Sequence, residues 1–130
     1  MGLGTAYIAG FEKALEKNAD YILQMDADLS HNPRYIPIML EKLSGTDIVI
    51  GSRYISGGEV DQSWGVVRKF LSSIGNISIR IIGQLKVKDT TSGFKAFRSE
   101  VLNSLDLTQF RCKGFSFQVE MAQACQQLGY

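Results

Sequence analysis

The chain reads YILQMDAD from Tyr21 to Asp28, a short and mostly apolar run that ends in two acidic residues. The run from Tyr21 to Met25 is typical of a strand that is covered on both faces of a sheet. Before it, apolar residues from Leu3 to Leu15 recur at helical spacing and predict a helix. The two carboxylates are therefore expected at the C-terminal end of a strand that follows a helix.

The rest of the chain continues this alternation of helix and strand. Asn32 is a candidate N-cap and Pro33 a candidate first residue of the next helix. We expect helices at residues 33–43, 67–81, 99–105 and 117–128, and strands at residues 48–50 and 94–97. The apolar stripe of the helix at 67–81 is expected to lie mostly in the core. This order predicts a single α/β domain over residues 1–130 with a mostly parallel sheet.

Composition restricts the classes of function. Cys112 and Cys125 lack the spacing of a zinc site, so free thiols are expected. No segment approaches the ~18 consecutive apolar residues of a membrane span, and the first residues do not resemble a signal sequence. A reducing, cytosolic setting is therefore the default expectation.

Charge is distributed unevenly along the chain. Residues 1–61 contain 5 basic and 9 acidic side chains, whereas residues 62–113 contain 9 basic and 3 acidic ones. This division predicts carboxylates for a cation in the first part, and basic groups for phosphate or an anionic lipid surface in the second. Two ordinary solvated faces are the alternative.

Asp26 and Asp28 are candidate metal ligands. Mg²⁺ usually takes one or two carboxylates, keeps waters, and uses substrate phosphates for its remaining positions. Residues at i and i+2 point to the same side of a strand, and ligands of open sheets lie beyond the carboxyl ends of parallel strands. A metal site is therefore expected here, with solvated loop acids as the alternative. His31 is expected to be a cap-region histidine rather than a ligand.

Basic residues after the second strand are candidate phosphate ligands. Arg53 leaves that strand at the same end of the sheet as the acidic pair, which predicts a phosphate clamp. Arg68 and Lys69 begin the next helix after a glycine-containing loop and are placed to fold over a pyrophosphate. Surface ion pairs are the alternative for each of them.

Five other positions are further candidates for the site: Gly4, Asp89, Ser92, Lys113 and Glu120. Asp89 and Ser92 belong to a run of small polar residues that predicts either a ligand-binding turn or a plain connection. Glu120 follows a glycine and aromatic cluster that begins at Lys113, and is either a supporting acid or a solvated one. Gly4 at a helix start allows backbone N–H groups to approach a phosphate or sugar, or serves close helix packing.

Five segments together resemble the dolichyl-phosphate mannosyltransferases of glycosyltransferase family 2. They are residues 2–7, 25–33, 51–54, 89–94 and 117–121, in the order and spacing of that family. The resemblance implies a partial GT-A (Rossmann-like) fold. It also implies inverting transfer of a sugar, usually mannose from GDP-mannose or glucose from UDP-glucose, to a polyprenyl phosphate.

The resemblance also implies roles for individual residues. Asp26 and Asp28 would approach the donor pyrophosphate through Mg²⁺ or Mn²⁺. Ser30 stands where some relatives have a glutamine that completes the metal shell. Arg53 and Arg68 match arginines that hold phosphates.

Asp28, Arg53 and Asp89 are the expected catalytic residues. A hydroxyl acceptor would instead require a general base, for which Asp89 or Glu120 is the candidate.

The resemblance further implies a peripheral location at the cytoplasmic face of a membrane, with a membrane-anchoring subunit or domain as a possible partner and no nucleic acid. Relatives begin with a strand, helix and strand that bind the nucleotide base, and continue past Tyr130. The chain is therefore expected to be a domain truncated at both ends and weakly active or inactive alone.

Two alternatives belong to other classes of function. Haloacid-dehalogenase-like phosphatases also place Asp-x-Asp after an apolar strand. Their motif normally ends in Thr or Val, where Ser30 stands, and the downstream Asp-Asp pair that they require does not occur. The other alternative is a non-catalytic domain that binds only nucleotide, metal or a partner.

Overall fold

The computed structural model describes residues 2–52, 66–112, 114 and 116–130, with only the backbone for residues 66–72. The helices are α1 (Leu3–Glu16), α2 (Ile36–Lys42), α3 (Val66–Ile82), α4 (Ser99–Ser104) and α5 (Ser116–Gln127). The strands are β1 (Tyr21–Gln24), β2 (Ile48–Ile50) and β3 (Lys95–Arg98), and 3-10 turns occur at Pro33–Tyr35 and Leu107–Gln109. The expected order of elements is confirmed, and Asn32 caps the first 3-10 turn through its side chain.

The sheet has the strand order β1-β3-β2, and both pairings are antiparallel. Phe97 of β3 lies opposite Ile22 of β1 on one side and Ile48 of β2 on the other. The prediction of a mostly parallel sheet is therefore wrong for the part of the chain that the structure describes. β1 and β2 do run in the same direction, but β3 is inserted between them in the opposite direction.

This arrangement brings three chain segments to one end of the sheet. β1 and β2 finish there, and β3 begins there because it runs in the opposite direction. The N–H of Gly51, just after β2, donates to the carbonyl of Phe94, just before β3, at 2.8 Å. The turn before β3 therefore lies beside the residues that follow β1 and β2. We call this end of the sheet the acidic edge, because Asp26 lies on it.

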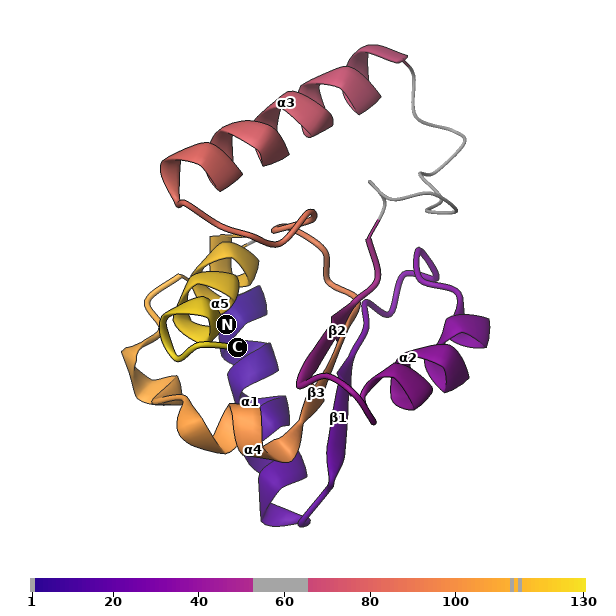
Figure 1. The fold of residues 1–130 in the computed structure, drawn as a ribbon, viewed down its shortest axis with the longest axis vertical. Coiled ribbons are helices and arrows are strands. Elements are labelled where there is room, and N and C mark those ends of the chain that lie inside the picture. Colours follow the sequence, from indigo (N-terminus) through magenta and orange to yellow (C-terminus); the bar gives the residue numbers. More distant parts are fainter. Residues whose placement is uncertain (1, 53–65, 113, 115) are drawn as a thin grey trace.

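Helices cover both faces of the sheet, with α1, α4 and α5 on one face and α2 on the other (Figure 1). The larger core cluster includes Phe11, Phe97 and Phe117, which are at most 3% exposed. The smaller cluster, under α2, is built on Met39, Leu43, Phe94 and Ala96. Neighbouring strand residues such as Ala96 and Phe97 thus serve opposite faces, as the two-residue repeat of a strand requires.

Helix α3 differs from the expectation that its apolar stripe lies in the core. Ile74, Ile77 and Ile81 are 44%, 48% and 72% exposed, whereas Asn76 is 4% exposed. Figure 1 shows α3 beyond the acidic edge, separate from the helices that cover the sheet. For these three isoleucines the prediction was wrong, because helical periodicity reveals that a helix has an apolar side but not which way that side faces. The side chains of Val67, Phe70 and Leu71, in the same predicted stripe, lie outside the described part of the chain.

Two expectations from composition can be compared with the structure. Cys112 and Cys125 are both free, as expected. Within the described ranges, we find no helix with the length and apolar character needed to cross a membrane.

Candidate functional site at the acidic edge

Asp26 is fixed by contacts from three parts of the chain. The Tyr7 hydroxyl of α1 donates a hydrogen bond to its carboxylate, and its backbone N–H donates to Nδ1 of His31 at 3.2 Å. Gly93, in the turn before β3, packs directly on the carboxylate: a Cβ added there would lie 2.7 Å from Oδ2. The half-buried carboxylate is therefore held in one place before any ligand arrives.

Asp28 lies at the exposed rim of the same loop. Its carboxylate accepts a hydrogen bond from the backbone N–H of Ser30 at 3.0 Å. The side chain and the backbone of Ser30 hold the pKa of the Asp28 carboxyl below its usual value, so the group is ionised at neutral pH. Between them, Leu29 has a positive φ of 66° and is 90% exposed. A bulky residue in this conformation stores backbone strain, which is typical of functional loops.

Both acidic residues affect the pKa of the Tyr7 hydroxyl. Burial and the hydrogen bond to Asp26 raise the pKa of its phenol, and the charges of Asp26 and Asp28 raise it further. Both carboxylates therefore act on one hydroxyl group, which keeps its proton and remains a donor. The Tyr7 ring is held in turn by stacking on Phe117, with ring centroids 5.8 Å apart.

His31 has a structural contact in this loop. Its ring stacks on Phe94 at a centroid distance of 5.0 Å, and its Nδ1 accepts from the backbone of Asp26. These contacts attach the loop after β1 to the first residue before β3. The expectation that His31 is a cap-region histidine rather than a metal ligand stays a prediction.

The turn at residues 89–94 is ordered by its own polar side chains. The buried Asp89 carboxylate accepts from the backbone N–H and the hydroxyl of Thr91, both at 3.2 Å. The Ser92 hydroxyl donates to the Gly51 carbonyl at 2.6 Å and accepts from the Phe94 N–H at 3.2 Å. Asp89 and Ser92 therefore shape the turn that places Gly93 against Asp26.

The side-chain oxygens at this edge can be compared with the ligands that Mg²⁺ or Mn²⁺ prefers. In the described part of the chain, no three His, Cys, Asp or Glu side chains gather closely enough to hold a metal ion by themselves. Two carboxylates with an adjacent serine suit a hard cation whose other ligands are water and substrate phosphate. Asp26, Asp28 and Ser30 thus fit a cation that arrives with its substrate, and their role as ligands stays a prediction.

Two predicted substrate ligands have packing roles in the structure. Gly4 lies against the carbonyl of Cys112 and the ring of Phe117, where an added Cβ would be 3.0 Å from that ring. Glu120 accepts the backbone N–H groups of Arg111 and Cys112 at 3.1 and 3.0 Å. Burial opposes ionisation of Glu120, but these hydrogen bonds outweigh it and hold its pKa below the usual value.

Four predicted residues cannot be placed at the edge. Arg53 and Lys113 lie outside the described residues, and so do the side chains of Arg68 and Lys69, whose backbone belongs to the first turns of α3. Their roles as phosphate or substrate ligands stay predictions.

Sequence reasoning missed Tyr7, Leu29 and Gly93 as site residues. Tyr7 belongs to the stripe of the first predicted helix and to residues 2–7 of the family resemblance, but its separation of 19 residues from Asp26 gives no local signal of their contact. Gly93 is recognisable only from the close approach of two segments that are distant in sequence. For Leu29, the one signal that the sequence offered was an apolar residue between two polar ones, Asp28 and Ser30.

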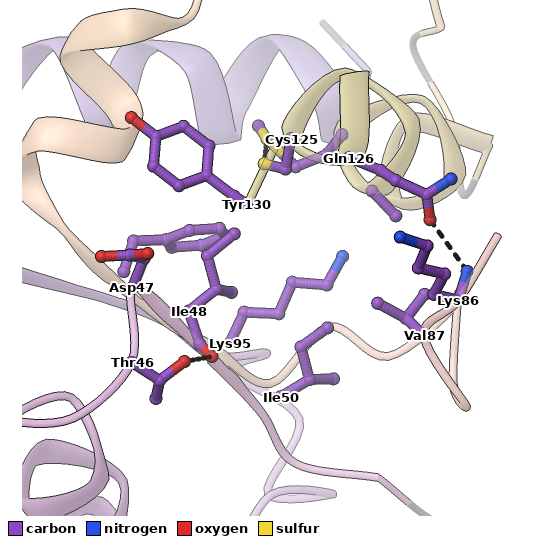
Figure 2. A pocket seen from close by; sticks show the side chains of 13 residues that line it. Thr46, Asp47, Ile48, Ile50, Lys86, Val87, Lys95, Cys125, Gln126 and Tyr130 are labelled. Carbon is purple, nitrogen blue, oxygen red and sulfur yellow. Dashed lines mark hydrogen bonds between the residues drawn. The ribbon is translucent and has the colours of Figure 1, made fainter. Parts of the chain in front are cut away.

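A separate cavity of about 170 Å³ lies between the sheet and α5, and its lining includes Lys95, Cys125 and Tyr130 (Figure 2). The buried Lys95 ammonium donates to the side-chain and backbone oxygens of Gln118 at 2.7 and 3.3 Å. Burial lowers the pKa of Lys95 to about 8.

Comparison with known proteins bears on the chemistry of the acidic edge. Residues 1–106 match the family described as Glycosyl transferase family 2. The chain belongs to this family. It is 42% identical over 128 residues to an undecaprenyl-phosphate mannosyltransferase of Micrococcus luteus, covering 98% of the chain and 52% of that protein.

It is also 39% identical over 121 residues to a polyprenol monophosphomannose synthase of Mycolicibacterium smegmatis, covering 92% of the chain and 45% of that protein. The family 2 chain thus spans about half the length of the curated relatives it matches.

Proposed function

We propose that the protein transfers a sugar from a nucleotide donor to a polyprenyl phosphate, with inversion and with Mg²⁺ or Mn²⁺, and that the sugar is mannose from GDP-mannose rather than glucose from UDP-glucose. The observation that carries this proposal is the acidic edge, where Asp26 and Asp28 follow a strand. Tyr7 and Gly93 hold the Asp26 carboxylate, and the Ser30 N–H holds that of Asp28. Two relatives whose names specify polyprenyl phosphate mannosylation support the choice of sugar and acceptor.

In the proposed reaction, an oxygen of the lipid phosphate attacks the anomeric carbon, and the bond to the nucleoside diphosphate breaks. The acceptor is largely ionised near neutral pH, since a phosphate monoester has a second pKa of about 6. It needs no strong base, and the main obstacle is repulsion between acceptor and donor phosphates. Two unit charges 4 Å apart interact by about 4 kcal/mol at an effective dielectric constant of 20.

Residues of the chain would reduce this repulsion and stabilise the leaving nucleoside diphosphate. Asp26 and Asp28 are the residues that would hold a divalent cation, which would supply positive charge to the departing diphosphate. Tyr7 and Gly93 fix the Asp26 carboxylate, and the Ser30 N–H fixes that of Asp28. Arg53, Arg68, Lys69 and Lys113 are the proposed phosphate ligands.

A hydroxyl acceptor is the second candidate, and it would require Asp89 or Glu120 as a base. Both carboxylates already accept two hydrogen bonds from the protein, Asp89 from Thr91 and Glu120 from Arg111 and Cys112. These contacts favour an ionised acceptor. We further propose a peripheral site of action at the cytoplasmic face of a membrane, with an anchoring subunit or domain supplied elsewhere.

The test is mannose transfer from labelled GDP-mannose to a short polyprenyl phosphate. It is measured on the chain alone and on a chimera in which residues 1–130 replace the matching segment of the Micrococcus luteus relative. Asp28→Ala and Arg53→Ala are each expected to abolish transfer, and Glu100→Ala, at an exposed position of α4, is the control. Retained transfer in both variants would overturn the proposal. Binding of GDP-mannose and Mn²⁺ by calorimetry, without transfer by the unmodified chimera, would favour a non-catalytic domain.

A further inference from the structure

Three polar side chains are buried on the face of the sheet that α1 and α5 cover. Gln24 of β1, Lys95 of β3 and Gln118 of α5 are 3%, 2% and 1% exposed. Gln24 and Lys95 are direct partners in the register of the sheet. Each lies two residues from a member of the larger core cluster, Ile22 or Phe97, so both side chains point to that face. We call Gln24, Lys95 and Gln118 the buried polar layer.

The amide groups of the buried polar layer have hydrogen-bonding capacity that the described residues do not use. Gln118 Oε1 accepts from Lys95, but Gln118 Nε2 and both polar atoms of the Gln24 amide are buried without a hydrogen-bond partner in the described part of the chain. The Lys95 ammonium has three N–H groups, and both of its acceptors named above belong to Gln118. Buried polar groups of native proteins are nearly always paired, often with ordered water. The Gln24 amide is therefore expected to accept from one neighbour and to donate to another.

Tyr7 is the neighbour to which Gln24 can donate. Burial and Asp26 raise the pKa of the Tyr7 phenol, and the side chain of Gln24 opposes this increase. Such an effect is that of a group that donates a hydrogen bond toward the phenol oxygen. The Tyr7 hydroxyl itself donates to the Asp26 carboxylate, and a hydroxyl can donate and accept at the same time. A donor on Gln24 would therefore direct the proton of Tyr7 toward Asp26.

Lys95 is the neighbour from which Gln24 can accept. Partner residues on one face of an antiparallel pair have Cβ atoms about 4.5–5.5 Å apart, within reach of long side chains. Burial lowers the pKa of Lys95, and the charges of Cys125 and Asp89 oppose that decrease. Asp89 begins the turn that places Gly93 against Asp26, so the ammonium acts electrostatically on the acidic edge. Hydrogen bonds that follow one another from a cation to an anion polarise each other in the same direction.

We propose that Lys95, Gln24 and Tyr7 form one directed chain of hydrogen bonds that positions the Asp26 carboxylate. An N–H of Lys95 donates, directly or through one ordered water, to Oε1 of Gln24. Nε2 of Gln24 donates to the Tyr7 oxygen, and the Tyr7 hydroxyl donates to Asp26. Gln24 and Lys95 are thus positioning residues that act through Tyr7. The proposal rests on the proposed function in one respect, since Asp26 is taken there as a ligand of the cation.

The first test is nuclear magnetic resonance of the full chain with ¹³C-labelled tyrosine, without metal or nucleotide. The Cζ resonance of Tyr7 is identified by its absence in Tyr7→Phe. We expect it to shift in Gln24→Met and in Lys95→Met, because the hydrogen bonding of the phenol oxygen changes. Lys95→Met should have no further effect once Gln24 is replaced. Gln123→Met, at an exposed glutamine of α5, is the matched control and should leave the resonance in place.

The second test is calorimetry with GDP-mannose and Mn²⁺. Gln24→Met is expected to weaken binding about fivefold, the factor that corresponds to one ordinary hydrogen bond. In a Tyr7→Phe background the same replacement should have no further effect, because Gln24 acts through the Tyr7 hydroxyl. Gln123→Met should bind normally. Additive losses in the double variant would overturn the inference, and so would a Tyr7 resonance that neither Gln24→Met nor Lys95→Met shifts.

Circular dichroism checks that each variant is folded. If Gln24→Met is not, Gln24→Asn retains an amide but draws it away from Tyr7, and the same shift of the Tyr7 resonance is expected. Because the resonance is measured without nucleotide, it is independent of transfer. The expected shifts without mannose transfer by the chimera would contradict only the proposed function. Transfer with an unchanged Tyr7 resonance in the variants would contradict only the present inference.

Discussion

At the scale of single residues, Tyr7 and Asp26 are brought together from α1 and β1. The Tyr7 hydroxyl donates to the Asp26 carboxylate, and its ring stacks on Phe117 in the core. A hydrogen bond to a charged group contributes more than one between neutral groups, so this contact both stabilises the fold and orients a proposed metal ligand.

We expect Tyr7→Phe to lower the free energy of unfolding by about 2 kcal/mol, because a half-buried carboxylate loses its donor while the ring packing is kept. Metal-dependent binding of the donor should also weaken. Chemical denaturation and calorimetry measure the two effects. Tyr21→Phe removes a hydroxyl from a residue that is 45% exposed, and serves as the control. Equal changes in the two variants would contradict a specific role for the Tyr7 hydroxyl.

Some residues of the candidate site could be predicted from the sequence, and others could not. Asp26 and Asp28 could be proposed from a local pattern, because both follow one apolar strand. Tyr7 and Gly93 could not, since their contacts with Asp26 span 19 and 67 residues and depend on how α1 and β3 pack. Gly4 shows the same difficulty, because only the structure reveals its contact with Cys112 and Phe117.

At the scale of elements, the turn before β3 is the part of the site that depends on close packing. Its Gly93 leaves no room for a side chain beside Asp26, and its Ser92 hydroxyl attaches it to the end of β2.

Gly93→Ala is expected to displace the Asp26 carboxylate, since the new methyl group would lie 2.7 Å from Oδ2. We predict loss of metal-dependent donor binding, measured by calorimetry, with the helical content retained in circular dichroism. Gly10→Ala is the matched control, because its added methyl group meets nothing within 4 Å in α1. That variant should be more stable by up to about 1 kcal/mol, as alanine favours helix. Normal binding of the nucleotide sugar by Gly93→Ala would contradict this prediction, because it would show that binding does not depend on the position of the Asp26 carboxylate.

Element positions could be predicted from periodicity, but strand direction and helix orientation could not. The two-residue repeat of β3 is the same whether it runs parallel or antiparallel to β1. The apolar stripe of α3 has the same spacing whether Ile77 is buried or exposed. The direction of a strand and the orientation of a helix both depend on contacts between distant segments. One such contact is the hydrogen bond that the Thr90 N–H donates to the Asn76 side chain.

At the scale of the whole molecule, Lys95 places an ammonium group in the middle of the domain. It is 2% exposed, and its pKa is lowered from 10.5 to about 8 because burial disfavours the charged form. Between these two values, the unfolded chain binds more protons at this side chain than the folded chain does. The contribution of Lys95 to the free energy of unfolding therefore rises with pH between these two pKa values.

We predict that the free energy of unfolding of the chain rises above pH 8, by at most about 3 kcal/mol from Lys95. Cys125 acts in the opposite sense above pH 9, because burial raises its pKa from 9.0 to about 11 and the unfolded chain ionises first. The difference between the chain and Lys95→Met, from urea unfolding at several pH values, isolates the lysine. Lys42→Met, at an exposed position, should follow the unmodified chain. A constant difference across the range would contradict the titration of Lys95.

The position of β3 in the middle of the sheet has a consequence for folding kinetics. Tyr21 of β1 pairs with Arg98, and Ile48 of β2 pairs with Phe97, so both pairings close long loops. Contacts so distant in sequence form late, because the entropy of loop closure must be overcome first. Gly93 reaches Asp26 only through those pairings. Competence to bind the nucleotide sugar should therefore develop with the slowest folding phase, which would make donor binding a probe of the final step of folding.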